Sequence, residues 1–238
     1  MAKTYAQIYT QCSRDTGDTT GDTTSGHLYY IMQKVNDALR EICNFMNYSW
    51  LKRSENITLV SEQQTYLLSG LTATIDEDRP CFLYYRGSDN SRQEIPILDD
   101  SEFQTYEDAD AENPVYARLT YMDGTWRLQL NCPPSSSFVS LYTNITLEFI
   151  KKVTELSAAD DIPEIPSGHH QALIYWTNML ICAEQGDDAG ITRWERLAYR
   201  SLGKLNARQQ HRTGTSKRVR VASYLSIGSI RSRRDYND

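Results

Sequence analysis

The chain has 238 residues, of which 39% are hydrophobic, and its formal net charge is −6. This length allows one large or two small domains with a real core. No apolar run approaches the roughly 18 residues that a membrane span needs, and the N-terminal segment lacks the apolar core of a signal peptide. We therefore expect a soluble protein that stays in the compartment where it is made and has no membrane partner.

The charges are distributed unevenly along the chain. Residues 204–238 contain nine basic and two acidic residues, which gives this segment a formal charge of +7. Residues 1–203 contain 16 basic and 29 acidic residues, which gives a formal charge of −13. An acidic body with a basic tail is a layout that indicates interaction with a partner.

The cysteines are odd in number, scattered along the chain, and never stand in a CxxC spacing. Their odd number argues against a disulfide framework, and their spacing argues against a zinc site. We expect free buried thiols in a reducing cytosol. The five residues are Cys12, Cys43, Cys81, Cys132 and Cys182.

Helical periodicity marks the first part of the chain. Residues 2–15 fit a short helix with its apolar side chains on one side. The Gly-Asp-Thr-Thr tandem that follows has the composition of a solvated loop, and its spacing does not fit the known calcium-binding loops. Residues 27–47 place apolar side chains at steps of three and four. This pattern predicts an amphipathic helix of about twenty residues with Ser25 as its N-cap.

The period changes to two from about residue 50. Short segments rich in β-branched and aromatic residues alternate with turn-forming clusters, which predicts a small antiparallel β-sandwich or barrel. Asp123-Gly124 is a strong signal for a type I′ turn, so we predict a hairpin there. The acidic residues 107–113 fit a loop. The predicted strands are 56–60, 65–68, 81–85, 94–98, 115–122, 126–131, 140–142 and 145–150.

The helical period returns after residue 156. Pro163 and Pro166 exclude a helix before Ser167, and Ser167 is placed to cap the helix that follows. The tight turn GDDAG, in which an aspartate can cap the next helix, predicts an antiparallel helical hairpin. Because these helices lack enough apolar surface to stand alone, we expect them to bundle with the N-terminal helix around Trp176 and Trp194.

The order of the elements is helix, β-module, two helices and tail. It predicts an α+β fold in which a small α-helical bundle carries an inserted antiparallel β-sandwich or barrel module and an extended C-terminal arm. We expect residues 1–49 and 157–206 to form the bundle, residues 50–156 the β-module, and residues 207–238 the basic arm.

The sequence offers little for catalysis. It contains no GxSxG, HExxH or Walker motif. Adjacent histidines on a helix point about 100° apart, so His169 and His170 cannot converge on one metal ion without strain. We interpret them as structural residues at the end of a bundle; His27 begins a predicted helix, and His211 lies in the basic tail. We predict no enzymatic activity, no catalytic or metal site and no cofactor.

The basic tail is the candidate functional element. Arginine clusters neutralise phosphates, so nucleic-acid binding is one interpretation, and a disordered soluble tail is another. The alternation of apolar residues in VRVASYLSI favours a third, a strand that docks on a partner's sheet by β-augmentation. The predicted docking residues are Lys217, Arg218, Val219, Arg220, Val221, Tyr224, Leu225, Ile227, Ile230, Arg231, Arg233 and Arg234.

Four segments resemble motifs of the head-to-tail adaptor proteins of tailed bacteriophages, also called head-completion or tail-connector proteins. The helix VNDALREICNFMNYSW and the strand pair NITLVSEQQTYLL carry the first part of this resemblance. The segment IPEIPSGHHQALIYWTNMLICAEQGD and the closing helix RWERLAYRSLGKL carry the second part. Together they cover most of residues 25–205 in the family's order.

The resemblance implies a structural protein of the virion neck that is assembled in the host bacterial cytoplasm. Such proteins form a ring, typically of twelve copies, between the portal protein and a downstream tail or nozzle protein. Their C-terminal tails reach into the portal, and viral DNA passes through the lumen without sequence-specific binding. We expect the acidic body to line or approach this channel, where negative charge keeps the DNA from sticking. The alternative is a cell-surface or carbohydrate-binding β-sandwich module of a virion or bacterium, which the 16 tyrosines favour.

Overall fold

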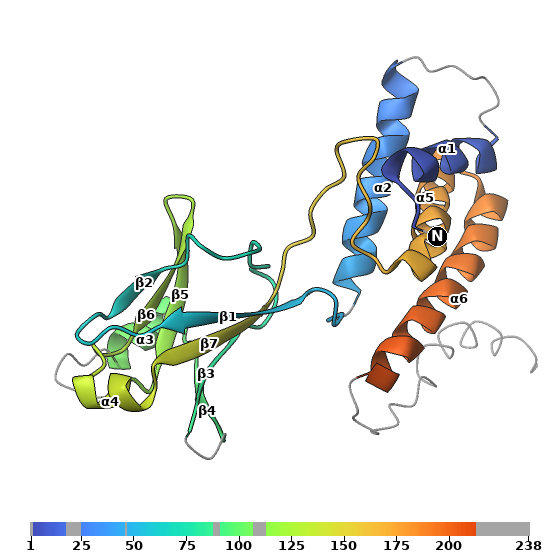
Figure 1. Cartoon of the computed structure of the whole chain (residues 1–238). Helices are drawn as coiled ribbons and strands as arrows, with labels where there is room; N and C mark the ends of the chain where they lie inside the picture. The colour runs from blue at the N-terminus through green and yellow to red at the C-terminus, as the bar shows by residue number, and fades with distance from the viewer. Residues whose placement is uncertain (1, 18–24, 46, 88–90, 107–112, 213–238) are drawn as a thin grey trace, which may run out of the picture.

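The computed structural model describes residues 2–17, 25–45, 47–87, 91–106 and 113–212. Within these residues the chain has the predicted α+β fold, with helices gathered at one end and two antiparallel sheets at the other (Figure 1). Each end has its own hydrophobic core. The helical core also includes Leu51 and Ile150, which lie where the chain enters and leaves the sheets.

Four long helices form the helical end of the molecule. They are α1 (Tyr5–Asp15), α2 (Ser25–Asn44), α5 (His170–Gln185) and α6 (Asp188–Arg212). Helix α5 packs against α1, α2 and α6 and lies between α2 and α6 (Figure 1). Because α5 is surrounded on several sides, nine of its residues are buried, among them Trp176.

The predicted N-terminal helix is confirmed. The Thr4 side chain accepts a hydrogen bond from the Gln7 backbone amide, and the Gln7 side chain accepts one from the Thr4 amide, so the helix begins with a capping box. Tyr5, Ile8 and Cys12 are buried on one side of α1, as their spacing predicts.

Two predicted helix caps are wrong. Helix α2 begins at Ser25 itself, so Ser25 is a residue of the first turn rather than the N-cap. Residues Ser167–His169 form a 3₁₀ turn and α5 begins only at His170, with no side-chain cap from Ser167. The 3₁₀ turn satisfies part of the helix start through the backbone, since the His169 amide donates to the Pro166 carbonyl at 2.7 Å.

The structure confirms the predicted tight turn between α5 and α6. Gly186 ends α5 in the left-handed region at φ 71°. Asp187 then caps α6, because the Gly190 amide donates to its Oδ1 at 2.9 Å. A Cβ on Gly190 would lie 2.3 Å from Asp187 Oδ2 and 2.6 Å from Cys182 Sγ, so this position needs glycine for space.

The strands form two antiparallel sheets that share one core, which is a small β-sandwich. The four-stranded sheet has the order β1 (Lys52–Thr58), β7 (Asn144–Ile150), β3 (Phe82–Arg86) and β4 (Arg92–Ile95). The three-stranded sheet has the order β2 (Thr65–Leu67), β6 (Thr125–Leu130) and β5 (Ala117–Met122). Strand β1 pairs with β7, so the first and last strands of the module lie side by side and return the chain to the helices.

The β5–β6 hairpin confirms the predicted type I′ turn. Asp123 has φ 53° and Gly124 has φ 77°, and a type I′ turn requires positive φ at both central residues.

Two short helices of the β-module were not predicted. Residues 140–142, predicted as a strand, fall at the end of α4 (Ser136–Leu141), where Ser135 accepts from the Phe138 amide at 3.2 Å. Helix α3 (Asp100–Tyr106) precedes the acidic loop, of which residues 107–112 lie outside the described residues. Each helix has one buried aromatic side chain, Phe138 in α4 and Phe103 in α3. One apolar residue is not enough to give the periodic pattern from which a helix is predicted.

Candidate assembly surfaces

The predicted docking arm cannot be placed. Residues 217–234 lie outside the described residues, so their role stays a prediction. Helix α6 runs to Arg212, so residues 207–212 are helical and do not begin the extended arm. The arm therefore follows directly from the C-terminal end of α6.

His170 has the structural role that its position predicts. Its ring is 2% exposed; Nδ1 accepts from the Lys3 backbone amide at 2.9 Å, and Nε2 donates to the Ile165 carbonyl at 2.8 Å. Burial lowers the pKa of His170, which favours the neutral ring that this pattern requires. The ring thus ties the N-terminal segment to the loop before α5.

The cysteines are free thiols, and four of the five are buried. Burial raises the pKa of Cys12 and of Cys43 to about 12, which makes both poor nucleophiles. In the described ranges, no group of three or more His, Cys, Asp or Glu side chains is arranged to hold a metal ion. No helix in the same ranges is long and apolar enough to cross a membrane.

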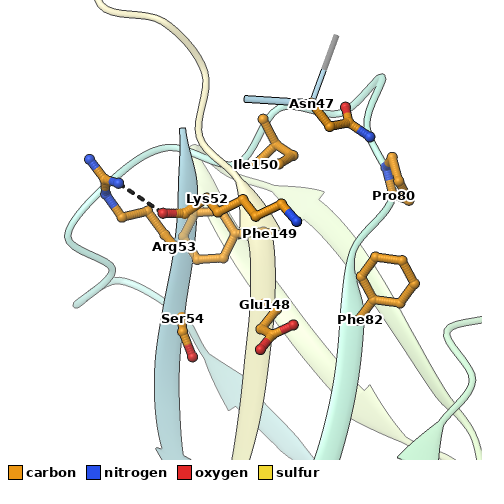
Figure 2. Close-up of a pocket in the computed structure, with 9 residues that line it drawn as sticks. All are labelled: Asn47, Lys52, Arg53, Ser54, Pro80, Phe82, Glu148, Phe149 and Ile150. Atoms are coloured by element: carbon orange, nitrogen blue, oxygen red, sulfur yellow. Dashed lines mark hydrogen bonds between the residues drawn. The ribbon is translucent and has the colours of Figure 1, made fainter. Parts of the chain in front are cut away.

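A hollow of about 490 Å³ opens on the outer face of the four-stranded sheet, next to the helical end. Phe82 and Pro80 stand on one side of it, Lys52 reaches across from β1, and Glu148 rises from β7 between them (Figure 2). Phe82 is 48% exposed. An exposed ring beside a cation and a carboxylate suits contact with another protein surface.

A cluster of polar and aromatic side chains continues this outer face. Glu148 accepts from the Tyr84 hydroxyl at 3.0 Å and from Arg92 at 3.2 Å. The Arg92 guanidinium lies 3.9 Å from the centre of the Tyr84 ring, a cation–π contact that leaves this tyrosine only 3% exposed. These contacts hold the side chains of the outer face in one arrangement, and a preorganised surface loses less entropy on binding.

A second exposed surface lies at the tip of the β5–β6 hairpin. Tyr121 and Met122 are each 52% exposed, and the Tyr121 ring lies 5.2 Å from that of Trp126. The hairpin projects from the sandwich (Figure 1). Large exposed apolar side chains on a projecting element are typical of interaction sites.

Arg79 connects the β-module to the helical end and was missed by the sequence analysis. Its guanidinium donates to Asn47 Oδ1 at 2.6 Å, to the Cys43 carbonyl at 3.3 Å and to Asn44 Oδ1 at 3.4 Å. A cation at the C-terminal end of α2 also interacts favourably with the helix dipole. In the sequence, Arg79 is a single arginine that follows three acidic residues and precedes Pro80. This local pattern does not identify hydrogen-bond partners that lie 32 to 36 residues away.

The hollow on the sheet face is lined by one carboxylate, two cations, two neutral polar side chains and four apolar side chains. Such a mixture of charged, polar and apolar groups suits contact with another protein.

Comparisons with known proteins identify the family of this chain. The family model described as SU10 adaptor protein matches residues 3–222, which include all described helices and both sheets. No curated protein sequence matches the chain. Among solved structures, a chain from the neck of an empty GTA particle is 12% identical; the alignment covers 82% of this chain and 94% of that chain, with a TM-score of 0.25. The family match confirms the adaptor resemblance of the sequence motifs, and the chain belongs to the SU10 adaptor protein family.

Proposed function

We propose that this adaptor forms a ring under the portal of a tailed phage, joins the capsid to a tail or nozzle protein, and lets DNA pass through its lumen. The family match over residues 3–222 carries the proposal, because it includes the helices, the β-module and the beginning of the arm. The same breadth gives no support to a separate carbohydrate-binding β-sandwich, which would leave the helices and the arm unexplained.

The arm is the portal-docking element in this proposal. Residues 213–238 follow the last turn of α6, and the segment from Lys217 to Arg234 combines six basic residues with an alternating apolar pattern. Such a segment can add a strand to a partner's sheet while its cations meet acidic groups. The β-module, with its exposed hairpin tip, is then available to the tail-side partner. The acidic residues of the body keep passing DNA from adhering to the ring.

The test is assembly on the cognate portal, observed by electron microscopy with particle averaging. We expect the full chain to form a ring on the portal, with a copy number that matches it, and a variant that lacks residues 213–238 to lose the complex. A second variant, Val219→Asp with Val221→Asp, keeps the arm and its cations but breaks the apolar alternation. Full-chain samples without a ring on the portal would overturn the proposed function. Rings that form equally well without the arm would overturn the docking role alone.

A further inference from the structure

The solvent face of α6 is strongly basic. Arg193, Arg196, Arg200 and Lys204 are all exposed. At about 100° per residue they lie within roughly an 80° arc of the helix, and they extend over about 16 Å of its length. The opposite side of α6 packs into the molecule through Trp194, Ala198, Leu202 and Leu205.

These four cations lack acidic partners within the part of the chain that the structure describes. Two other cations of the helical end are paired: Lys34 with Asp37 and Glu184, and Arg40 with Asp37 and Glu155. Residues 1–203 as a whole have a formal charge of −13, so the arc stands out against its surroundings. A row of unpaired, mostly arginine cations on a rigid helix is suited to an acidic partner.

An acidic surface lies on the other side of the bundle. Residues 153–164 contain four acids and no base, and Glu155 and Asp160 among them are exposed. The segment is held in place, because the Leu156 amide donates to Asn36 Oδ1 at 2.9 Å and its carbonyl accepts from Asn36 Nδ2 at 3.0 Å. Beside it lies a groove of about 580 Å³ in which Tyr29 is 61% exposed and in which Arg40 Nε lies 3.8 Å from Glu155 Oε1.

The two surfaces face away from each other. The acidic segment lies against α1 and α2, as the hydrogen bond from the Tyr5 amide to the Asp161 carbonyl and the Asn36 contacts show. Helix α6 lies on the other side of α5 (Figure 1). One copy therefore cannot satisfy its own basic face with its own acidic segment, but two copies placed side by side can.

We propose that the basic face of α6 docks on the acidic segment and groove of the next copy in the ring. This inference rests on the proposed ring function and names the surfaces that form it. Contact between two different patches repeats from copy to copy and closes into a ring when the rotation allows. The charges set the register and the speed of association, while apolar groups such as Tyr29 and the hollow beside Tyr175 and Leu197 provide buried area. The net charge of the body disfavours the other acidic partner, DNA.

Charge reversal on each side tests the contact. The first variant carries Arg196→Glu, Arg200→Glu and Lys204→Glu. The second carries Glu155→Lys and Asp160→Lys; Asp161 stays, because it accepts from the Ser157 and Ala158 amides at 2.7 Å. We expect each variant alone to lower ring formation on the portal by more than about tenfold, because facing like charges cost several kcal/mol.

Mixing the two variants is the more specific test of the contact. Each restores the partner that the other lacks, so an equimolar mixture should form rings of alternating copies, as should a single chain with all five changes. The control is Arg86→Glu with Lys152→Glu, two exposed cations of the β-module outside the hollow on the sheet face, which shifts the net charge in the same direction and should leave ring formation unchanged. Circular dichroism melting of each variant checks that the fold is kept.

The outcomes separate this inference from the proposed function. If the wild-type chain forms rings and both variants do so equally well, the ring exists but uses other surfaces. If neither the variants nor their mixture form rings, the two faces are not held together by complementary charges, and the inference is overturned. If the α6 variant keeps its rings but loses salt-sensitive affinity for a fluorescent DNA duplex, the face belongs to DNA and the inference is overturned. A wild-type chain that forms no ring on the portal overturns the function and the inference together.

Discussion

A single imidazole ring holds together two parts of this protein that are 167 residues apart in sequence. His170 accepts from the amide of Lys3, a contact that needs the neutral ring, and donates to the carbonyl of Ile165. Its neighbour His169 lies in the 3₁₀ turn and is also buried. The pair therefore stabilises the entry to α5, as the sequence analysis expected of a structural role.

The pKa of His170 gives a pH dependence with a definite sign. Because its pKa is lowered from 6.5 in the folded protein, the unfolded chain binds more protons below that pH. The contribution is therefore fully present above about pH 6.5 and is lost as the pH falls towards the lowered pKa. We expect His170→Ala to reduce the free energy of unfolding by about 1–3 kcal/mol at pH 7 and to flatten its decline below pH 6.5.

Urea unfolding followed by circular dichroism between pH 5 and pH 8 measures both effects. His27→Ala serves as the control, because this histidine lies outside the helical core. An equal decline in wild type and His170→Ala would show that another group is responsible.

At the scale of elements, the joint between α2 and the sandwich depends on a few polar contacts. Arg79 donates to the Cys43 carbonyl and to the side chains of Asn44 and Asn47, and its Nε lies 3.8 Å from Asp76. Side-chain exposures of 14% for Arg79 and 17% for Asp76 show that this group is largely shielded from water. The joint therefore fixes how the helix end meets the loop before β3.

Removal of the Arg79 side chain should loosen this joint. We expect Arg79→Ala to cost about 1–2 kcal/mol, because it leaves a helix-end carbonyl and two side-chain acceptors without their donor. Hydrogen exchange measured by mass spectrometry should increase in the last turn of α2 and in residues 76–80. Lys152→Ala, an exposed cation close by in the fold, should change neither quantity. Unchanged exchange at the end of α2 would mean that apolar packing alone holds the joint.

At the scale of the whole molecule, two cores support two ends of different architecture. Leu173 is fully buried in the helical core and Leu147 is fully buried in the sandwich core. We propose that the two ends are separate cooperative units, with Leu51 and Ile150 as the apolar link between them. Two ends that unfold separately can each contact a different neighbouring protein.

Matched cavity variants test that division. Leu147→Ala and Leu173→Ala each remove the same buried atoms, so each should cost about 2–5 kcal/mol. Hydrogen exchange should rise mainly in the sandwich for the first variant and mainly in the helices for the second. If hydrogen exchange rises uniformly across the chain in both variants, the chain is one cooperative unit. The predicted β-module of residues 50–156 would then not be a separate unit of unfolding.

The features that depend on near neighbours in the chain can be predicted from the amino-acid sequence. The three- and four-residue steps of α2, the Asp123-Gly124 turn and the Gly186-Asp187 junction each follow from a few adjacent side chains and backbone angles. The same local patterns, in their order, were enough to indicate the adaptor family, which the match over residues 3–222 confirms.

The features that depend on distant partners become visible only in the folded chain. Strand order, the Arg79 joint and the His170 bridge each bring together residues far apart in sequence, and no local pattern encodes such a contact. The short helices α3 and α4 each bury one aromatic side chain, Phe103 and Phe138. A single buried residue leaves no periodic pattern in the sequence, so neither helix could be predicted. The basic residues of α6 were visible in the sequence only as charge; their position opposite the acidic segment follows from α5 lying between α2 and α6. Burial and distance are properties of the folded chain, and they decide which of its many charged and apolar side chains are left to meet a partner.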